Sequence, residues 1–242
     1  MPEAAIILTC WLLHATQKSL VPRALPFILV LTSATSAIRM FATSVHSSQR
    51  SLTSREILSL DVKLRCDEWT EFNIEGNPIP SFTELVLEVK PNQVTLVPDG
   101  HDQITSNHGW DTLENKSFLT DICKVFKEAG IRTSIFVDAD PRMVEGAKAC
   151  GADRVELYTE PYASGYQANR EAAIAPFIAA AEEARKVGLG LNAGHDLSLE
   201  NLHYYHQQIP WTDEVSIGHA LICDALYLGL KETIKQYLQA LQ

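Results

Sequence analysis

Residues 189–196 read LGLNAGHD, and residues 214–220 read EVSIGHA. Each stretch is a short apolar run that ends in a glycine next to a histidine. This arrangement is typical of a buried parallel strand whose carboxyl end presents a polar side chain to a pocket. Two such strand ends in succession predict the mouth of a barrel, where neighbouring strands supply side chains to one site.

From about residue 68 onward, short β-type runs alternate with helical patterns. We expect strands at 71–74, 93–97, 133–137, 154–157, 189–192 and 214–217, and helices at 81–89, 116–129, 141–150, 168–187, 199–207 and 220–241, the last broken near Gly229. Because these strands read as apolar throughout, we expect a parallel sheet covered by helices, an α/β fold of the TIM (β/α)8-barrel type. Only six strand–helix units are recognisable, so the barrel should be incomplete or irregular over its first two units.

The composition restricts the class of protein. The 242 residues are 46% hydrophobic and 21% charged, as in an ordinary soluble globular domain. A net charge of −10 argues against a nucleic-acid-binding surface, which needs clustered Lys and Arg, but leaves room for small anionic substrates. The five cysteines are widely spaced and lack a CxxC pair, which indicates neither a disulfide framework nor a zinc site. A reducing cytoplasm is the simplest location.

Four stretches together resemble one enzyme family. These are TEFNIEG at 70–76, QVTLVPD at 93–99, and the two glycine–histidine stretches. They closely resemble the pyridoxine 5'-phosphate synthase family, over about residues 70–241. The resemblance implies condensation of 3-amino-2-oxopropyl phosphate with 1-deoxy-D-xylulose 5-phosphate to pyridoxine 5'-phosphate, inorganic phosphate and water. It also implies acid–base catalysis without a metal or redox cofactor, and a large homo-oligomer such as the family's octamer.

The resemblance assigns three catalytic residues. Glu75 becomes a general base, and burial at a barrel rim would raise the proton affinity of its carboxylate toward neutrality. His195 becomes the proton donor that helps a hydroxyl leave. Glu156, expected on the strand at 154–157, corresponds to a residue that stabilises the transition state.

Four further residues are assigned to substrate binding. Thr105 matches a contact to the deoxyxylulose phosphate, and Asp196 joins the amine-phosphate site through its backbone. Gly218 and His219 precede a helix, where backbone N–H groups would face the phosphate of 3-amino-2-oxopropyl phosphate.

Two other groups of polar residues are not assigned to the site. Asp138 and Asp140 read as a strand end and a helix cap rather than a metal site. His203 and His206 lie on one expected helix without an acidic or Cys partner, so we expect surface residues rather than metal ligands.

The first quarter of the chain departs from the family. Residues 4–54 contain no Asp or Glu, and the family's first-strand Asn/Asp pair and second-strand His and Arg residues have no counterpart there. Reading each codon's last base with the first two bases of the next codon permits two strings that resemble segments of the family, one of them its second strand and the loop after it. We therefore interpret residues 1–55 as an out-of-frame, non-family leader and 56–242 as a single barrel domain. The alternative is an organellar transit peptide. The chain as written should have little or no activity.

Two other functions stay open. The chain could be a non-catalytic barrel remnant that serves as an assembly subunit. It could also be another phosphate-binding barrel enzyme, such as an isomerase or aldolase, although no Lys stands at an expected strand end to form a Schiff base.

Overall fold

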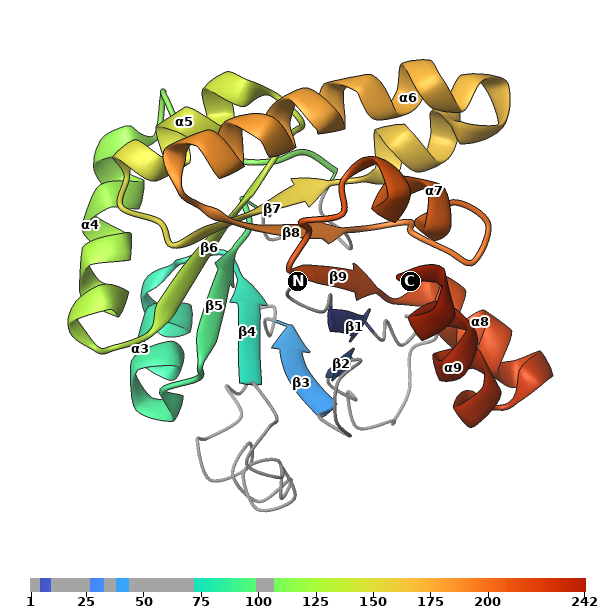
Figure 1. Ribbon diagram of the computed structural model, residues 1–242. Helices are drawn as coiled ribbons and strands as arrows, with labels where there is room; N and C mark the ends of the chain where they lie inside the picture. The colour runs from blue at the N-terminus through green and yellow to red at the C-terminus, as the bar shows by residue number, and fades with distance from the viewer. Residues whose placement is uncertain (1–4, 10–26, 33–37, 44–71, 99–106) are drawn as a thin grey trace, which may run out of the picture.

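The computed structural model describes residues 5–9, 27–32, 38–43, 72–98 and 107–242. The strands form a ring, and the described helices lie outside its β4 to β9 part (Figure 1). The strands are β1 (Ala5–Thr9), β2 (Phe27–Thr32), β3 (Ile38–Thr43), β4 (Phe72–Gly76), β5 (Gln93–Leu96), β6 (Arg132–Val137), β7 (Arg154–Tyr158), β8 (Gly190–Gly194) and β9 (Glu214–Ile217). The helices are α3 (Pro80–Val89), α4 (Lys116–Glu128), α5 (Pro141–Ala149), α6 (Glu160–Val187), α7 (Leu202–Gln208), α8 (His219–Leu228) and α9 (Leu230–Ala240).

The strands close into a barrel in sequence order, with β9 returning to β1. All neighbours from β3 to β9 are parallel, and β1 is parallel to β9. Only β2 runs antiparallel to its neighbours, β1 and β3. The predicted barrel is therefore confirmed, and its irregularity lies where the sequence placed it. Strands from the first 55 residues pair with the edges of β4 and β9.

The strands are not apolar throughout, which corrects the sequence interpretation. Ile74, Val94 and Val155 belong to the buried core between sheet and helices. The alternate residues on the same strands, such as Asn73 and Glu156, are buried but polar. A closed barrel has a second interior, its lumen, and here that lumen is lined by polar side chains.

The helix boundaries follow local signals in the sequence. At the start of α5, the Asp140 carboxylate accepts a hydrogen bond from the Arg142 N–H at 2.9 Å, with Pro141 in the first turn. At the end of α6, Gly188 adopts a left-handed conformation, with φ 69°. The predicted break at Gly229 is confirmed, because that residue separates α8 from α9.

Helix α6 is longer than predicted, starting at Glu160 rather than residue 168. It bends at Asn169, whose backbone is non-helical, with φ −162° and ψ 92°. The Asn169 side chain accepts a hydrogen bond from the Ala172 N–H at 3.0 Å, so it caps the second part of the helix. The sequence signal near residue 168 marked this internal cap rather than the start of the element.

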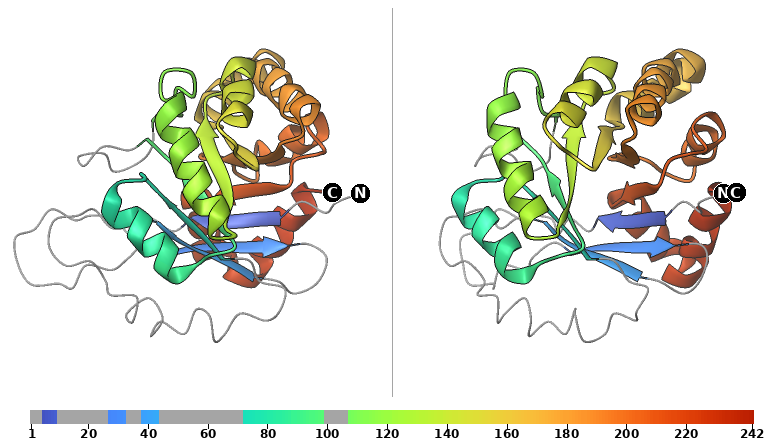
Figure 2. Two further views of the ribbon diagram at one scale, coloured as in Figure 1. Left: turned by 90° about the vertical axis from the view of Figure 1, so that its left-hand side faces the viewer. Right: turned by 60° about the vertical axis from the view of Figure 1, so that its left-hand side comes forward.

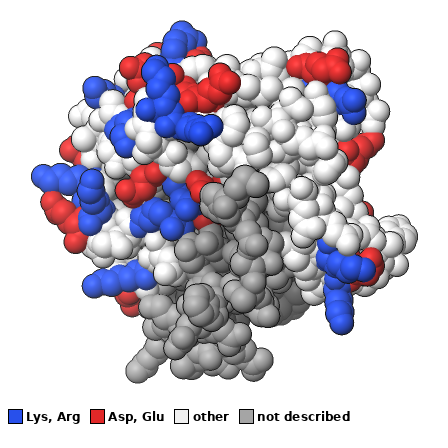
Figure 3. All heavy atoms as spheres, in the orientation of Figure 1, with Lys and Arg blue, Asp and Glu red and all other residues white. Residues whose placement is uncertain are grey.

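Helices α3 to α6 cover one side of the barrel, as the turned views show (Figure 2). On the face drawn in Figure 3, acidic and basic side chains are interspersed over the described part of the surface. The described part of that face presents no continuous basic patch of the kind that nucleic-acid binding requires. Within the described ranges, no helix combines the length and the apolar character needed to cross a bilayer.

Candidate active site

Two predicted catalytic glutamates are buried in the barrel. Glu75 lies near the end of β4 and is 7% exposed, and Glu156 lies in the middle of β7 and is 1% exposed. Burial raises the pKa of the Glu156 carboxyl well above its ordinary value, and the charges of Glu75 and Glu214 raise it further. Both effects favour the protonated form of this carboxyl, which can donate a hydrogen bond.

Gly194, the last residue of β8, provides the space for the Glu156 carboxyl. A Cβ at Gly194 would lie 2.1 Å from Glu156 Oε1 and 3.2 Å from Ser216 Cβ. Within the described part of the chain, Glu156 Oε1 is buried and makes no hydrogen bond. Because buried polar atoms are nearly always paired, this oxygen is a candidate contact for a ligand.

His195 follows directly and has a left-handed backbone, with φ 79°. Its ring packs against Phe136 and Tyr158, with centroid distances of 4.8 Å and 5.3 Å. Burial lowers the pKa of His195 to about 4, so the imidazole is neutral at physiological pH. The Thr159 hydroxyl donates to the carbonyl oxygens of Gly194 and His195, which fixes the backbone that carries the ring.

The segments after β8 and β9 meet beside this histidine. Asp196 also has a left-handed backbone, with φ 59°, and its carbonyl accepts a hydrogen bond from Asn201 Nδ2 at 3.1 Å. Burial, and then the charge of Glu160, raise the pKa of Asp196, whereas the neighbouring His219 lowers it. Gly218 is the N-cap residue of α8, and no side chain caps this helix end.

Of the other residues considered in the sequence, Thr105 lies outside the described residues. Asp138 accepts a hydrogen bond from the Gly109 N–H at 2.9 Å, and Asp140 caps α5 as predicted. His203 is exposed on α7, but His206 is only partly exposed and its Nδ1 is buried, which departs from the expected surface position.

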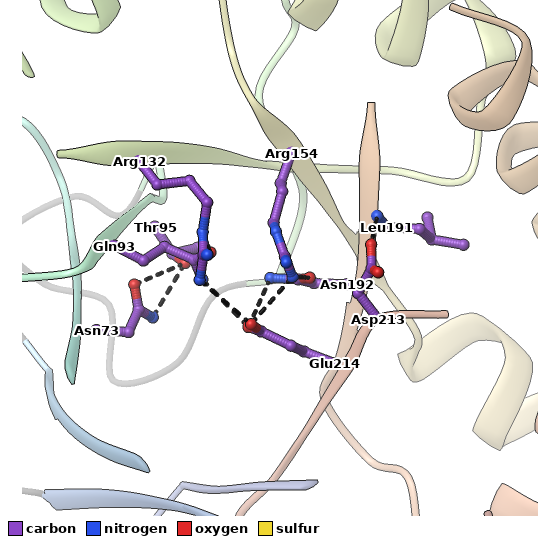
Figure 4. Close-up of polar contacts among 9 residues, drawn as sticks. All are labelled: Asn73, Gln93, Thr95, Arg132, Arg154, Leu191, Asn192, Asp213 and Glu214. Atoms are coloured by element: carbon purple, nitrogen blue, oxygen red, sulfur yellow. Dashed lines mark hydrogen bonds and ion pairs between the residues drawn. The ribbon is translucent and has the colours of Figure 1, made fainter. Parts of the chain in front are cut away.

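The structure also shows a polar cluster that the sequence analysis missed. We call it the barrel floor: Gln93, Arg132, Arg154 and Glu214, the first residues of β5, β6, β7 and β9, with Asn192 from the middle of β8 (Figure 4). Glu214 Oε1 lies 3.0 Å from Arg154 and 3.4 Å from Arg132, while Oε2 accepts hydrogen bonds from Asn192 at 3.1 Å and Gln93 at 3.3 Å. The period-two spacing of Glu214 and Ser216, or of Arg154 and Glu156, was the signal that could have revealed it.

A family model described as "Pyridoxal phosphate biosynthesis protein PdxJ" matches residues 28–242. The chain belongs to the PdxJ family. The predicted family resemblance is thereby confirmed, and the family match starts earlier than the residue 70 boundary, so it includes β2 and β3.

Curated relatives of this PdxJ chain are named pyridoxine 5'-phosphate synthase. The Bacteroides thetaiotaomicron protein is 66% identical over 173 residues, which cover 72% of this chain and 73% of that protein. The Phocaeicola vulgatus protein is 68% identical over the same length and the same shares. The Cytophaga hutchinsonii protein is 62% identical, again over 173 residues.

Solved structures support the fold of this PdxJ chain. The Amycolatopsis orientalis BexX/CysO complex includes a chain with a TM-score of 0.52 and 15% identity, covering 84% of this chain and 79% of that one. A tryptophan synthase α-subunit from Pyrococcus furiosus has a TM-score of 0.52 and 12% identity, covering 78% and 75%. At such low identity the likeness concerns the fold alone.

Proposed function

We propose that the chain is of the pyridoxine 5'-phosphate synthase type. It condenses 3-amino-2-oxopropyl phosphate with 1-deoxy-D-xylulose 5-phosphate, releasing inorganic phosphate and water as the pyridine ring closes. The observation that carries this proposal is the position of Glu156 against the Gly194–His195 strand end, with its buried Oε1 making no hydrogen bond among the described residues. Family membership and the names of the relatives support the same reaction.

Glu75, Glu156 and His195 each have one role in the reaction. Glu75 is the general base that removes protons next to carbonyl or imine carbons. Glu156, whose protonated form is favoured by burial and by neighbouring carboxylates, donates a hydrogen bond to oxygen atoms that gain negative charge. His195 gives a proton to the leaving hydroxyl. Because its pKa is about 4 in the unliganded protein, it becomes an effective donor only when a bound phosphate raises that pKa.

The substrate phosphates take two places. The N-terminus of α8, at Gly218 and His219, offers uncapped backbone N–H groups to the phosphate of 3-amino-2-oxopropyl phosphate, together with the backbone of Asp196. Thr105 contacts the phosphate of deoxyxylulose phosphate. We place the protein in the cytoplasm as a homo-oligomer.

We further propose that residues 1–55 are read out of frame, so that the family's barrel domain covers 56–242 and β1 to β3 take the place of its first strands. In that case the family's second-strand base and cationic phosphate ligands are absent, and loss of one general base costs about 10²- to 10⁴-fold in rate. A non-catalytic assembly subunit is the second candidate function. It is favoured by Leu226 and Tyr227, which are 80% and 90% exposed at the end of α8.

The test compares two purified proteins, the chain as written and a version with the family frame restored over residues 1–55. Both are given the two phosphorylated substrates, and pyridoxine 5'-phosphate and phosphate are measured by chromatography. We expect product from the restored protein, abolished by Glu75→Gln but kept in the exposed-site control Glu232→Gln. The written chain should be at least about 10²-fold slower.

Each contrary result removes a different proposal. Absence of product from both proteins would refute the synthase function. Equal rates would refute the proposal that residues 1–55 are out of frame. Growth of a pyridoxine-requiring strain on the restored gene, compared with the written gene, gives an independent readout.

A further inference from the structure

Arg154 could pair with either of two carboxyl groups, that of Glu214 in the barrel floor or that of Glu156. Arg154 and Glu156 are two residues apart on β7, so their side chains share the lumen face, with Cα atoms about 7 Å apart. An arginine side chain is long enough to bridge that separation. Arg154 nevertheless makes its ion pair with Glu214 on β9, at 3.0 Å, and leaves Glu156 Oε1 without a hydrogen bond among the described residues.

The path of Arg154 depends on a glycine. β8 lies between β7 and β9, and Gly190 pairs directly with Arg154 in the sheet register. A Cβ at Gly190 would lie 2.7 Å from Arg154 Cγ and 3.1 Å from its Nε. The arginine therefore crosses β8 in the space that this glycine leaves. Its guanidinium is then held by Asn192 Oδ1 at 2.9 Å and by Glu214.

Glu214 is fully occupied by this arrangement. Its two oxygens receive four side chains of the barrel floor, two arginines on Oε1 and two amides on Oε2. Figure 4 shows these side chains converging on the Glu214 carboxylate from neighbouring strands. A buried carboxylate with that number of partners is a strong anchor for the cations around it.

We infer that Glu214 is a positioning residue that draws Arg154 across Gly190 into the barrel floor and so withholds it from Glu156. The inference rests on the proposed function only for the use of Glu156 toward substrate. The consequence is a buried carboxyl against Gly194 that, among the described residues, forms no pair with an arginine at Oε1. Burial and the charges of Glu75 and Glu214 also raise the pKa of Glu156.

Within the described ranges, the charged groups that act on the Glu156 carboxyl are Glu75 on β4 and Glu214 on β9. Arg154 on its own strand and Arg132 on β6 pair with Glu214, and His195 follows Gly194, which lies against Glu156 Oε1. Replacing Glu214 removes one negative charge and also releases Arg154. The experiment must separate these two effects.

A double-mutant cycle on the full chain makes that separation. The protein is labelled with ¹³C at glutamate Cδ, and the Glu156 resonance is assigned by its loss in Glu156→Gln. Its titration midpoint is then followed by NMR in Glu214→Gln, Arg154→Gln and the double variant, with Glu232→Gln as a control. We expect Glu214→Gln to lower the midpoint by about one pH unit or more, because Arg154 then pairs with Glu156. With Arg154→Gln present, the same change should shift it by less than half as much.

Two results would overturn the inference: an unchanged midpoint in Glu214→Gln, or an equal shift with and without Arg154. If Glu214→Gln does not fold, Gly190→Ala replaces it, since the added Cβ displaces Arg154 while Glu214 is intact. The midpoint should then fall as well, and an unchanged value would overturn the inference. The titration needs no turnover, so its failure is distinguishable from failure of the proposed function.

Discussion

At the scale of single residues, Gly194 is a position where one added methyl group should lower turnover strongly. We predict that Gly194→Ala lowers turnover of the frame-restored protein by about 10²-fold, because the new Cβ would lie 2.1 Å from Glu156 Oε1 and displace the carboxyl. Steady-state assays of pyridoxine 5'-phosphate formation check this. Gly165→Ala in α6 is the matched control, since its nearest neighbour is the Ala173 Cβ at 3.0 Å. Equal activity of the two variants would contradict the prediction.

His195 should make the protein sensitive to acid. Its pKa of about 4 in the folded protein lies below the ordinary value of 6.5, so the unfolded chain binds more protons between these two pH values. The contribution of the neutral ring is present above pH 6.5 and is lost as the pH falls toward 4. We expect the free energy of unfolding to fall by about 2 kcal/mol more between pH 7 and pH 5 in the parent than in His195→Asn. Urea unfolding at both pH values measures it, and Asn tolerates the left-handed backbone. Parallel losses in parent and variant would argue against a buried neutral ring.

These residues show what the sequence could and could not reveal at this scale. The motifs brought Glu75, Glu156 and His195 to one barrel interior, as the buried positions and shared electrostatics of the glutamates indicate. The partners of these residues were not predictable in the same way. Arg154 crosses to a strand that lies 60 positions further along the chain, and only the sheet register brings Glu214 next to it.

At the scale of elements, the bend in α6 is a test of local capping. We expect Asn169→Ala to lower the free energy of unfolding by about 1 kcal/mol, because it removes the acceptor for the Ala172 N–H. Asn169→Asp keeps an acceptor oxygen and serves as the control. Chemical denaturation of the three proteins measures the difference. If both variants lose the same stability, the side-chain cap contributes nothing.

The six strand–helix units were predictable because short strand runs alternate with helical patterns, helped by local signals such as the Asp140 cap of α5 and Gly188 at the end of α6. Where a second signal lay inside an element, as at Asn169, the boundary was placed eight residues late. The face of each strand was the harder property. Core and lumen are both buried, so burial alone does not distinguish Ile74 from Asn73, and only closure of the sheet gives them different surroundings.

At the scale of the whole molecule, closure depends on strands that the sequence resemblance did not predict. β3 pairs with β4 and β1 pairs with β9, so strands from the first 55 residues cover both edges of the parallel sheet. An uncovered edge presents a row of unpaired N–H and C=O groups to other chains. A chain that begins at Phe72 lacks both β1 and β3, so the edges of β9 and β4 are left unpaired.

We predict that this truncated chain self-associates without limit. Its mean mass should rise continuously with protein concentration in sedimentation velocity and light scattering, because an added strand from another molecule replaces each lost neighbour. The full chain, with both edges paired, should show one species of fixed mass over the same range. A second truncated protein with Lys in place of Ile74 is not a suitable control, since Ile74 lies in the core. The suitable control is Glu232→Gln in the full chain, which changes an exposed side chain and leaves both edges covered. If the truncated chain stayed at one fixed mass, residues 5–43 would be dispensable for closing the barrel, and the edges of β4 and β9 would be protected by other means.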